Sequence, residues 1–275
     1  MWNPINKFVR ANTVAAAFLL TLLFTLLSAA VGFPTMRGGM EPKIGMPVFT
    51  VYQAALAVLG IWLMCKLRVR AGDDFKCKNI GRGFLLGWVM FALMTVIVLT
   101  SYANRSDYFI KPDPLFLLTV ILFPFSTGLL EEVVFRGIVL KILLQKMGGA
   151  KKGIINAFLV SAALFAAVHS IHLFWAAPLD VTVDLLLAVA GGVFMGSIYL
   201  RTKTLIPSIL LHGLFNLAGG IFTAFTGPEY TISPTTLADV AILALIGAIP
   251  LLVAAFVLLR KVGPEDVSCI SSGSA

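Results

Sequence analysis

The amino-acid sequence predicts an all-α, polytopic integral membrane protein with about eight transmembrane helices. Of its 275 residues, 59% are hydrophobic and only 12% are charged, whereas a soluble domain has roughly 45–50% apolar and 25% charged residues. The apolar residues form continuous runs that reach the roughly 20 residues a helix needs to cross a bilayer. These runs do not alternate with polar residues, and this excludes a membrane β-barrel.

Each predicted span is an apolar run with charged or turn-forming residues at its ends. The predicted spans cover about 13–33, 46–65, 83–101, 115–140, 154–174, 181–200, 205–225 and 238–259. We interpret the first run as an uncleaved span, because it is longer than the roughly 7–15 residues of a signal-peptide core. The fourth span is interrupted by Pro124 and Gly128, and the seventh begins near Pro207. With no repeat or linker in the sequence, we expect residues 1–275 to form a single transmembrane domain.

The positions of lysine and arginine predict the orientation. If the N-terminus is cytoplasmic, the cytoplasmic segments hold 16 of the 21 basic residues, the outer loops hold four, and Arg136 lies inside a span. This strong positive-inside bias places both termini in the cytoplasm. Anionic lipid headgroups explain the net charge of +8, so the charge requires no nucleic-acid partner. We expect a plasma membrane of the bacterial type, with the lipid bilayer as the main partner of the fold.

A small set of ionisable and polar residues lies deep inside the predicted spans. These residues are Glu131, Glu132 and Arg136 in the fourth span, His169 in the fifth, and His212 and Asn216 in the seventh. An ionised side chain at the bilayer centre costs about 2.5–3.5 kcal/mol on insertion scales, so such groups persist where they face one another or a water-filled cavity.

Helix spacing separates the roles of the two adjacent glutamates. Residues four apart share one face of a helix, so Glu132 can pair with Arg136. Glu131 is rotated by about 100° around the helix axis and points elsewhere. A single pair of this kind in a helix bundle is often purely structural. The sequence therefore predicts one glutamate held by arginine and one that is free for another task.

The same spacing of four recurs in the two histidine-containing spans. His212 and Asn216 project from one face of the seventh span, and Phe165 and His169 do so in the fifth. A lone histidine in a membrane more often makes an interhelical hydrogen bond than it catalyses a reaction, and a lone asparagine can simply join helices. A functional role is favoured over a purely structural one, because a carboxylate, two imidazoles and an amide are expected at comparable depths in the membrane.

Distances along the helices support a common depth for two of these groups. At 1.5 Å per residue, Glu131 lies about 15 Å from Lys141, and His212 lies about 14 Å from Lys203. His169 lies about 26 Å from the basic residues that open its span. A common depth therefore requires the fifth span to start late, to tilt or to kink.

Three short motifs carry a resemblance to a known family. They are EEVVFR at 131–136, FAAVH at 165–169 and HGLFN at 212–216. Each motif alone recurs by chance, but all three in order on three separate predicted spans are a specific match. Over residues 115–217 the chain resembles the CAAX-protease and bacteriocin-processing (CPBP, or Abi) family of intramembrane endopeptidases.

The resemblance implies an all-helical fold around a cavity open to the cytosol and a glutamate-type peptidase that needs no cofactor. The expected catalytic residues are Glu131, His169, His212 and Asn216, and the expected orienting or structural residues are Glu132, Arg136 and Phe165. Peptide hydrolysis needs an activated water and a stabilised oxyanion. We expect Glu131, assisted by His169, to take the proton from water while His212 and Asn216 bind the oxyanion. The expected substrate is a membrane-associated or lipidated peptide or protein.

Three alternatives remain open at this point. A zinc peptidase could use Glu131, His169 and His212 as ligands, although the sequence lacks a His-Glu-x-x-His motif. A proton-coupled transporter could use the same residues as a relay, but it should show inverted repeats that are not evident here. A non-catalytic scaffold or immunity protein would not require the complete set of motifs.

Overall fold

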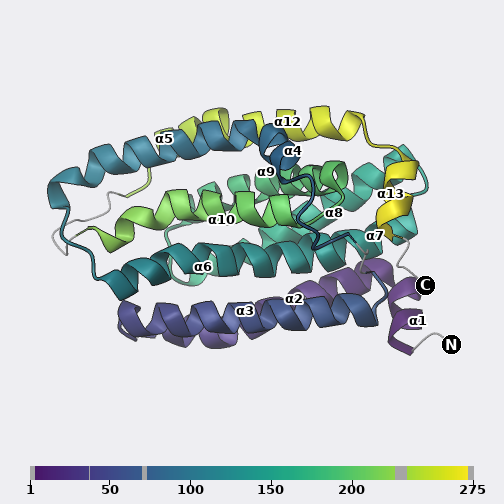
Figure 1. Ribbon diagram of the computed structural model, residues 1–275, viewed down its shortest axis with the longest axis horizontal. Coiled ribbons are helices and arrows are strands. Elements are labelled where there is room, and N and C mark those ends of the chain that lie inside the picture. Colours follow the sequence, from purple (N-terminus) through teal and green to yellow (C-terminus); the bar gives the residue numbers. More distant parts are fainter. Residues whose placement is uncertain (1–3, 37, 70–72, 227–233, 272–275) are drawn as a thin grey trace.

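The protein is a bundle of long helices that run along one axis of the molecule, as the computed structural model shows (Figure 1). The structure describes residues 4–36, 38–69, 73–226 and 234–271. Eight helices in this part of the chain are long and apolar enough to cross a membrane. An isolated β-bridge joins Phe109 to Thr226, and the described residues form no strand. The predicted all-α class with eight spans is confirmed.

The helices and helical turns follow in chain order. They are α1 (Pro4–Ala11), α2 (Thr13–Met36), α3 (Pro42–Lys66), α4 (Ile80–Leu86), α5 (Trp88–Arg105), η1 (Ser106–Tyr108), α6 (Pro114–Glu132), η2 (Val133–Val139), α7 (Leu140–Met147), α8 (Lys151–His169), η3 (Ser170–Phe174), α9 (Pro178–Thr202), α10 (Ile206–Gly220), η4 (Ile221–Ala224), α11 (Leu237–Leu243), η5 (Ala244–Ala248), α12 (Ile249–Arg260) and α13 (Pro264–Ser271). The turns η2 and η5 are π-helical, and η1, η3 and η4 are 3₁₀-helical.

The fourth span differs from the prediction in two respects. First, α6 runs without interruption through Pro124 and Gly128 to Glu132. Its start is well defined, because Asp113 caps it by accepting a 2.9 Å hydrogen bond from the Phe116 amide. Second, α6, η2 and α7 together form one span of 34 residues that ends at Met147 rather than near residue 140. At 1.5 Å per residue this is about 50 Å, well beyond the roughly 30 Å hydrocarbon core.

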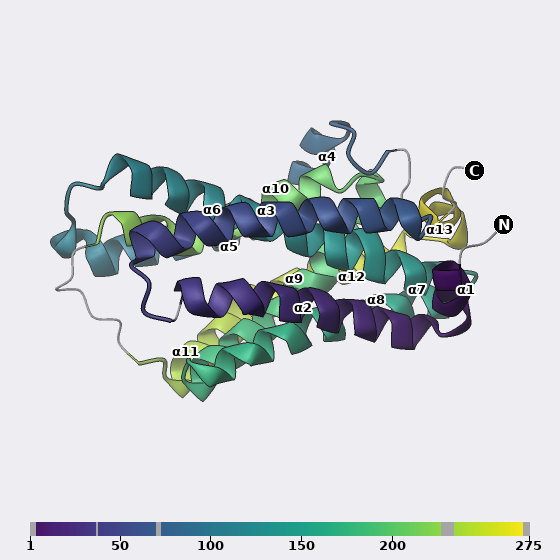
Figure 2. The ribbon, with the colours of Figure 1, turned by 90° about the horizontal axis from the view of Figure 1, so that it is seen from below.

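This long span lies at the centre of the bundle. The α6 segment packs between α3 and α10, and η2 contacts α2, α3 and α8. Figure 1 shows α6 between α3 and α10, and Figure 2 shows α2, α8 and α9 on the other side of the molecule. Helix α9 in turn joins α8 to α12. The polar residues of the fourth span are therefore surrounded by protein rather than by lipid.

Two glycines allow α6 and α10 to approach closely. A Cβ atom at Gly128 would lie 3.0 Å from the Gly213 amide nitrogen, and one at Gly213 would lie 2.3 Å from Phe125 Cδ1. Small residues at helix contacts are typical of membrane bundles, where backbones pack directly against one another. This contact places His212, the neighbour of Gly213, beside the two glutamates on α6 and fixes the spacing of the site.

Lys141 is enclosed by protein, although the sequence suggests only a charge near the end of a span. Its side chain is fully buried within the fourth span and pairs with the fully buried Asp74 at 2.5 Å. Tyr199 donates a 2.9 Å hydrogen bond to the other oxygen of Asp74, and Thr204 donates a 3.0 Å bond to its backbone carbonyl. Both partners of this pair are charged, so their burial is compensated by the ion pair and by the hydrogen bonds around Asp74. The pair joins the fourth span to the segment between α3 and α4.

The first and last helices lie at the same end of the molecule (Figure 1). Other segments meet them there: Lys151 donates to the carbonyls of Leu259 and Val262, and Lys203 bonds to Asp266 of α13 at 2.8 Å. This ion pair lowers the pKa of Asp266, which lies outside the spans. The segments rich in lysine and arginine thus gather at the end of the molecule that holds α1 and α13.

Candidate active site

Glu132 and Arg136 form a buried ion pair where α6 passes into η2. The Glu132 side chain is 0% exposed, the Arg136 side chain is 2% exposed, and Oε1 of the glutamate lies 2.9 Å from Nη1 of the arginine. Nη2 of Arg136 donates to the carbonyls of Gly192 at 3.1 Å and Gly191 at 3.4 Å. Its guanidinium also lies 4.8 Å from the centre of the Phe165 ring. Arg136 therefore ties the fourth span to α8 and α9.

His212 on α10 lies between the two glutamates. Its Nδ1 is 2.9 Å from Oε1 of Glu132, the same oxygen that meets Arg136, and its Nε2 is 3.4 Å from Oε2 of Glu131. A carboxylate only accepts hydrogen bonds, so Nδ1 donates to Glu132 when this glutamate is ionised. The contact between Nε2 and Glu131 is long for a hydrogen bond. One side of the imidazole is thus fixed, and the other faces Glu131.

Glu131 has quite different surroundings from Glu132. Its side chain is 24% exposed, and in the described part of the chain it pairs with His212 but not with an arginine or lysine. Burial and pairing therefore divide the two adjacent carboxylates as the helix spacing predicts. Glu131 keeps an exposed part of its side chain, whereas Glu132 is enclosed by Arg136 and His212.

Phe165 on α8 is the apolar contact that joins these groups. Its ring lies 4.8 Å from the Phe135 ring, 4.9 Å from the His169 ring and 6.1 Å from the His212 ring, all in edge-to-face arrangements. With the Arg136 guanidinium on its face, Phe165 contacts a residue from each of the three motifs. Helix α9 reaches the same point, because a Cβ atom at Gly192 would lie only 3.2 Å from Phe165 Cδ1.

His169 lies at the end of α8, and its Nδ1 is 2.8 Å from the Phe165 carbonyl oxygen. Because a carbonyl oxygen can only accept, Nδ1 carries the hydrogen and Nε2 of the neutral ring is left as an acceptor. Among the described residues no hydrogen bond joins His169 to Glu131. The expected assistance of Glu131 by His169 is therefore not seen as a hydrogen bond between these two side chains. The His169 ring instead lies 5.7 Å from the ring of His172, which pairs with Asp184 at 2.8 Å.

Asn216 is one helical turn beyond His212 on α10 and is partly buried. Its amide makes no side-chain hydrogen bond to any other residue that the structure describes. The donor N–H groups of Asn216 are therefore free for a ligand, in contrast to Nδ1 of His212.

Two features of the site were missed in the sequence. The first is the π-helix η2, which begins at the residue after Glu132 and contains Arg136. π-Helical turns occur mostly as single turns inside α-helices and are frequent at functional sites. The sequence carries no clear signal for such a turn, because apolar periodicity in a buried span does not distinguish π from α geometry.

The second feature is a polar cluster one turn before Glu131. Gln53 on α3 is buried, and its Oε1 accepts hydrogen bonds from Ser126 at 2.9 Å and from Thr127 at 3.0 Å. Thr127 is four residues before Glu131 and shares its side of α6. A glutamine inside the second predicted span was a usable signal, since amides there commonly bridge helices.

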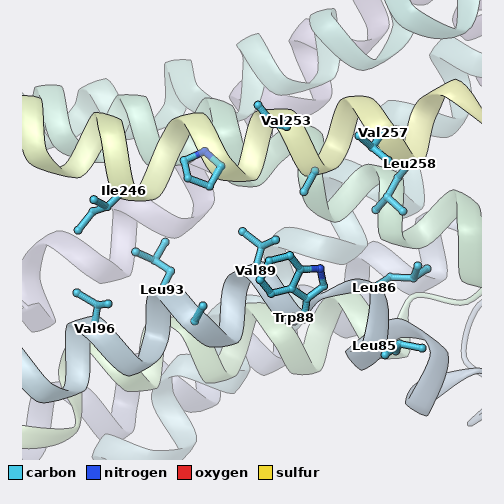
Figure 3. Close-up of a pocket in the computed structure, with 13 residues that line it drawn as sticks. Leu85, Leu86, Trp88, Val89, Leu93, Val96, Ile246, Val253, Val257 and Leu258 are labelled. Atoms are coloured by element: carbon cyan, nitrogen blue, oxygen red, sulfur yellow. The ribbon is translucent and has the colours of Figure 1, made fainter.

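The arrangement of donor groups also bears on metal binding. Within the described ranges, no three His, Cys, Asp or Glu side chains are placed so that they could hold a metal ion together. A groove of about 730 Å³ lies away from the glutamates, between α5 and α12 (Figure 3). The site itself is a set of packed polar side chains from α6, α8 and α10.

Comparison with known families identifies this part of the chain. A model of the type II CAAX prenyl endopeptidase Rce1-like family matches residues 113–218. Residues 113–218 are an Rce1-like domain. The match extends from the cap of α6 to the end of α10 and includes all three motifs. Comparisons with curated proteins and with solved structures gave no significant match.

The match identifies residues 113–218 as a membrane-peptidase domain of the Rce1-like type, as the resemblance in the sequence indicates. Membership implies intramembrane protease activity on protein substrates. The eight candidate spans agree with a polytopic integral membrane protein.

Proposed function

We propose that the protein hydrolyses a peptide bond of a membrane-associated peptide or protein, with Glu131 as the base that activates water. The observation that carries this proposal is the contrast between the two glutamates. Glu132 is fully buried and paired with Arg136, whereas Glu131 is 24% exposed and has only a long contact with His212. A general base must reach both water and substrate, and its greater exposure favours Glu131 over Glu132 for this role.

His212 is the proposed donor to the oxyanion. Glu132 holds Nδ1, so Nε2 is the nitrogen that faces Glu131 and the reacting groups. Because the contact of 3.4 Å between Nε2 and Glu131 is weak, a protonated Nε2 can turn toward a substrate oxygen without losing a strong bond. The unbonded amide of Asn216 on the same face of α10 supplies the second donor. Two such donors stabilise the charge that develops on the tetrahedral intermediate.

The proton balance of the reaction then follows from these positions. Glu131 takes a proton from water as the water oxygen bonds to the scissile carbonyl carbon, and the carbonyl oxygen becomes the oxyanion. The carbon–nitrogen bond breaks as the leaving nitrogen takes the proton from Glu131, and the carboxylate is restored. His169, whose Nε2 is left as an acceptor by the bond from Nδ1 to the Phe165 carbonyl, assists by orienting the water.

The proposed substrate approaches from the end of the molecule that holds α1 and α13. By the positive-inside rule this end is cytosolic. A lipidated substrate can leave its lipid chain in the inner leaflet while its peptide reaches Glu131, and exposed basic residues attract acidic headgroups or an acidic peptide there. Incubation of the purified protein with prenylated, leader-bearing and signal-derived peptides, with product analysis, identifies the substrate class.

Replacement of Glu131 by glutamine tests the proposed base. Glutamine is nearly isosteric but cannot take a proton, so we expect Glu131→Gln to lower turnover by about 100-fold or more with an unchanged melting temperature. Glu132→Gln is the matched control. It leaves the buried Arg136 without its counter-charge, so it should lower the melting temperature in detergent. Normal turnover in Glu131→Gln, with inactive but stable Glu132→Gln, would reverse the two roles.

Metal removal tests the zinc alternative. A carboxylate with hydrogen-bond donors around the oxyanion needs no metal to activate water, so we expect active protein to contain no stoichiometric zinc and to tolerate strong chelators. Elemental analysis before and after chelation, with activity measured on the same samples, provides the measurement. Activity that is lost on chelation and restored by zinc would establish Glu131, His169 and His212 as candidate ligands instead.

A further inference from the structure

The groove between α5 and α12 lies outside the proposed active site and has its own chemistry. It is lined on one side by Trp88, Val89 and Leu93, and on the other by Ile246, Val253 and Val257 (Figure 3). Every side chain that lines it is apolar or aromatic. Several of them are open to the outside of the bundle, including Trp88 at 65% exposure and Val253 at 58%. A ligand can therefore enter sideways from the bilayer.

The length of the groove matches one leaflet. The lining residues on the α12 side extend from Ile246 in the middle of the last span to Leu258 near its end. At 1.5 Å per residue this is about 18 Å, close to half of the roughly 30 Å hydrocarbon core. One extended acyl chain of a bilayer lipid fits this length, with its methyl end at the bilayer centre.

The end of the groove near the membrane surface is basic. Leu85, Leu86 and Leu258 line this end. The exposed Arg82 is one turn before Leu86, and the exposed Arg260 and Lys261 are two and three residues after Leu258. The Arg260 guanidinium lies 4.6 Å from the Phe256 ring, a contact that leaves its positive charge available. A lipid whose chain lies in the groove would thus place its headgroup among three cations.

We propose that this groove is a binding site for an anionic phospholipid, with one acyl chain between α5 and α12 and the phosphate and its acidic headgroup at Arg82, Arg260 and Lys261. The apolar lining selects a hydrocarbon chain, and the basic end selects a negative headgroup over a zwitterionic one. The proposal concerns a site on the opposite side of α9 and α10 from the glutamates, and it does not rest on the proposed peptidase mechanism.

Native mass spectrometry of the full chain in detergent tests this site. Phosphatidylglycerol and phosphatidylcholine with identical chains are the two probes. We expect phosphatidylglycerol to bind more tightly, and the triple variant R82Q/R260Q/K261Q to weaken its binding by about tenfold or more, since each basic residue near an anionic surface contributes about fivefold. Lys66, Lys146 and Lys152 are exposed at the same end of the molecule, so K66Q/K146Q/K152Q is the charge-matched control and should bind normally.

A second pair of variants tests the chain-binding part of the groove. Ala92 is exposed and lines the groove, so Ala92→Trp should fill it and abolish tight binding, whereas Val51→Trp on an exposed face of α3 should not. If the triple charge variant does not fold, the Ala92→Trp variant and the single variant Arg82→Gln test the proposal.

Each of four outcomes would overturn the proposal. Wild-type protein could retain both lipids equally, or the control triple variant could lose as much binding as R82Q/R260Q/K261Q. Ala92→Trp could leave lipid binding unaltered, or it could dissociate a dimer.

Discussion

At the scale of single residues, two adjacent glutamates have opposite surroundings. Glu132 shares one of its oxygens between Arg136 and His212, and it is closed off from solvent. Glu131 is rotated away from that pair and meets Nε2 of the same imidazole. His212 is therefore both a structural partner of one carboxylate and the neighbour of the other. A change at Glu132 or Arg136 should reach the chemistry through His212.

Removal of Arg136 should damage stability more than any other single change at the site. Arg136→Ala leaves the buried Glu132 charge uncompensated, with an expected loss of about 3–5 kcal/mol, and it frees the carbonyls of Gly191 and Gly192. We expect a sharp fall of the melting temperature in detergent. Lys111→Ala removes one exposed charge and should have little effect. An Arg136→Ala protein with normal melting but no activity would instead indicate that Arg136 contacts the substrate.

At the scale of helices, the contact between α6 and α10 holds the site together. Gly128 and Gly213 let the two backbones approach, and this approach brings His212 to the glutamates. The neighbouring helices add the fixed positions of Phe165 from α8 and the two glycine carbonyls from α9. The geometry of the candidate site thus depends on helix packing, because its side chains and carbonyls come from α6, α8, α9 and α10.

Substitution of the glycines on α10 tests this dependence. A methyl group at Gly213 would lie 2.3 Å from Phe125, whereas one at Gly219 has nothing within 4 Å. We expect Gly213→Ala to destabilise the protein by about 1–3 kcal/mol through overpacking and to lower activity by moving His212. Gly219→Ala is the matched control on the same helix and should be neutral or slightly stabilising. Equal effects of the two substitutions would show that the close approach is not required.

Helix periodicity and charge were sufficient to predict the eight spans and the pair of Glu132 with Arg136, because both depend on local spacing. Contacts between spans were harder to predict from the sequence. The bridge made by His212 depends on the angle between α6 and α10, which spacing along one helix does not define. The buried pair of Lys141 with Asp74 could not be predicted for a related reason, since the two residues are distant in the chain. A sequence shows a charge near a span end but not the buried residue that neutralises it.

At the scale of the whole molecule, the basic segments meet at one end. Asn6 of α1 bonds to the Lys66 carbonyl at 3.1 Å, and Lys203 holds α13 through Asp266. The same end contains the basic mouth of the lipid groove and, by the proposed topology, the route of the substrate. In the proposed topology the bilayer normal runs along the helices, and the end with α1 and α13 faces the cytosol.

Cysteine labelling tests that topology. In a background without Cys65, Cys77 and Cys269, we expect Asn216→Cys to react with a charged thiol reagent added on the cytosolic side, because water reaches the site from there. Asn104→Cys, which is exposed at the opposite end of the molecule, should react only from the outside. Protein in sealed vesicles of both orientations provides the measurement. Labelling of position 216 only from the outside would overturn both the topology and the proposed route.

The π-helix η2 affects how the buried charged residues before and after it are oriented around the helix axis. It separates Glu132, which faces His212, from Lys141, which faces Asp74. A wider turn accommodates an additional residue, so the rotation accumulated between these two positions differs from that of a regular α-helix. Deletion of one residue within η2 would rotate all that follows by about 100° relative to α6. The π-helical turn thus sets the rotation around the helix axis between Glu132 and Lys141. Insertions or deletions should be tolerated less there than in any loop of the bundle.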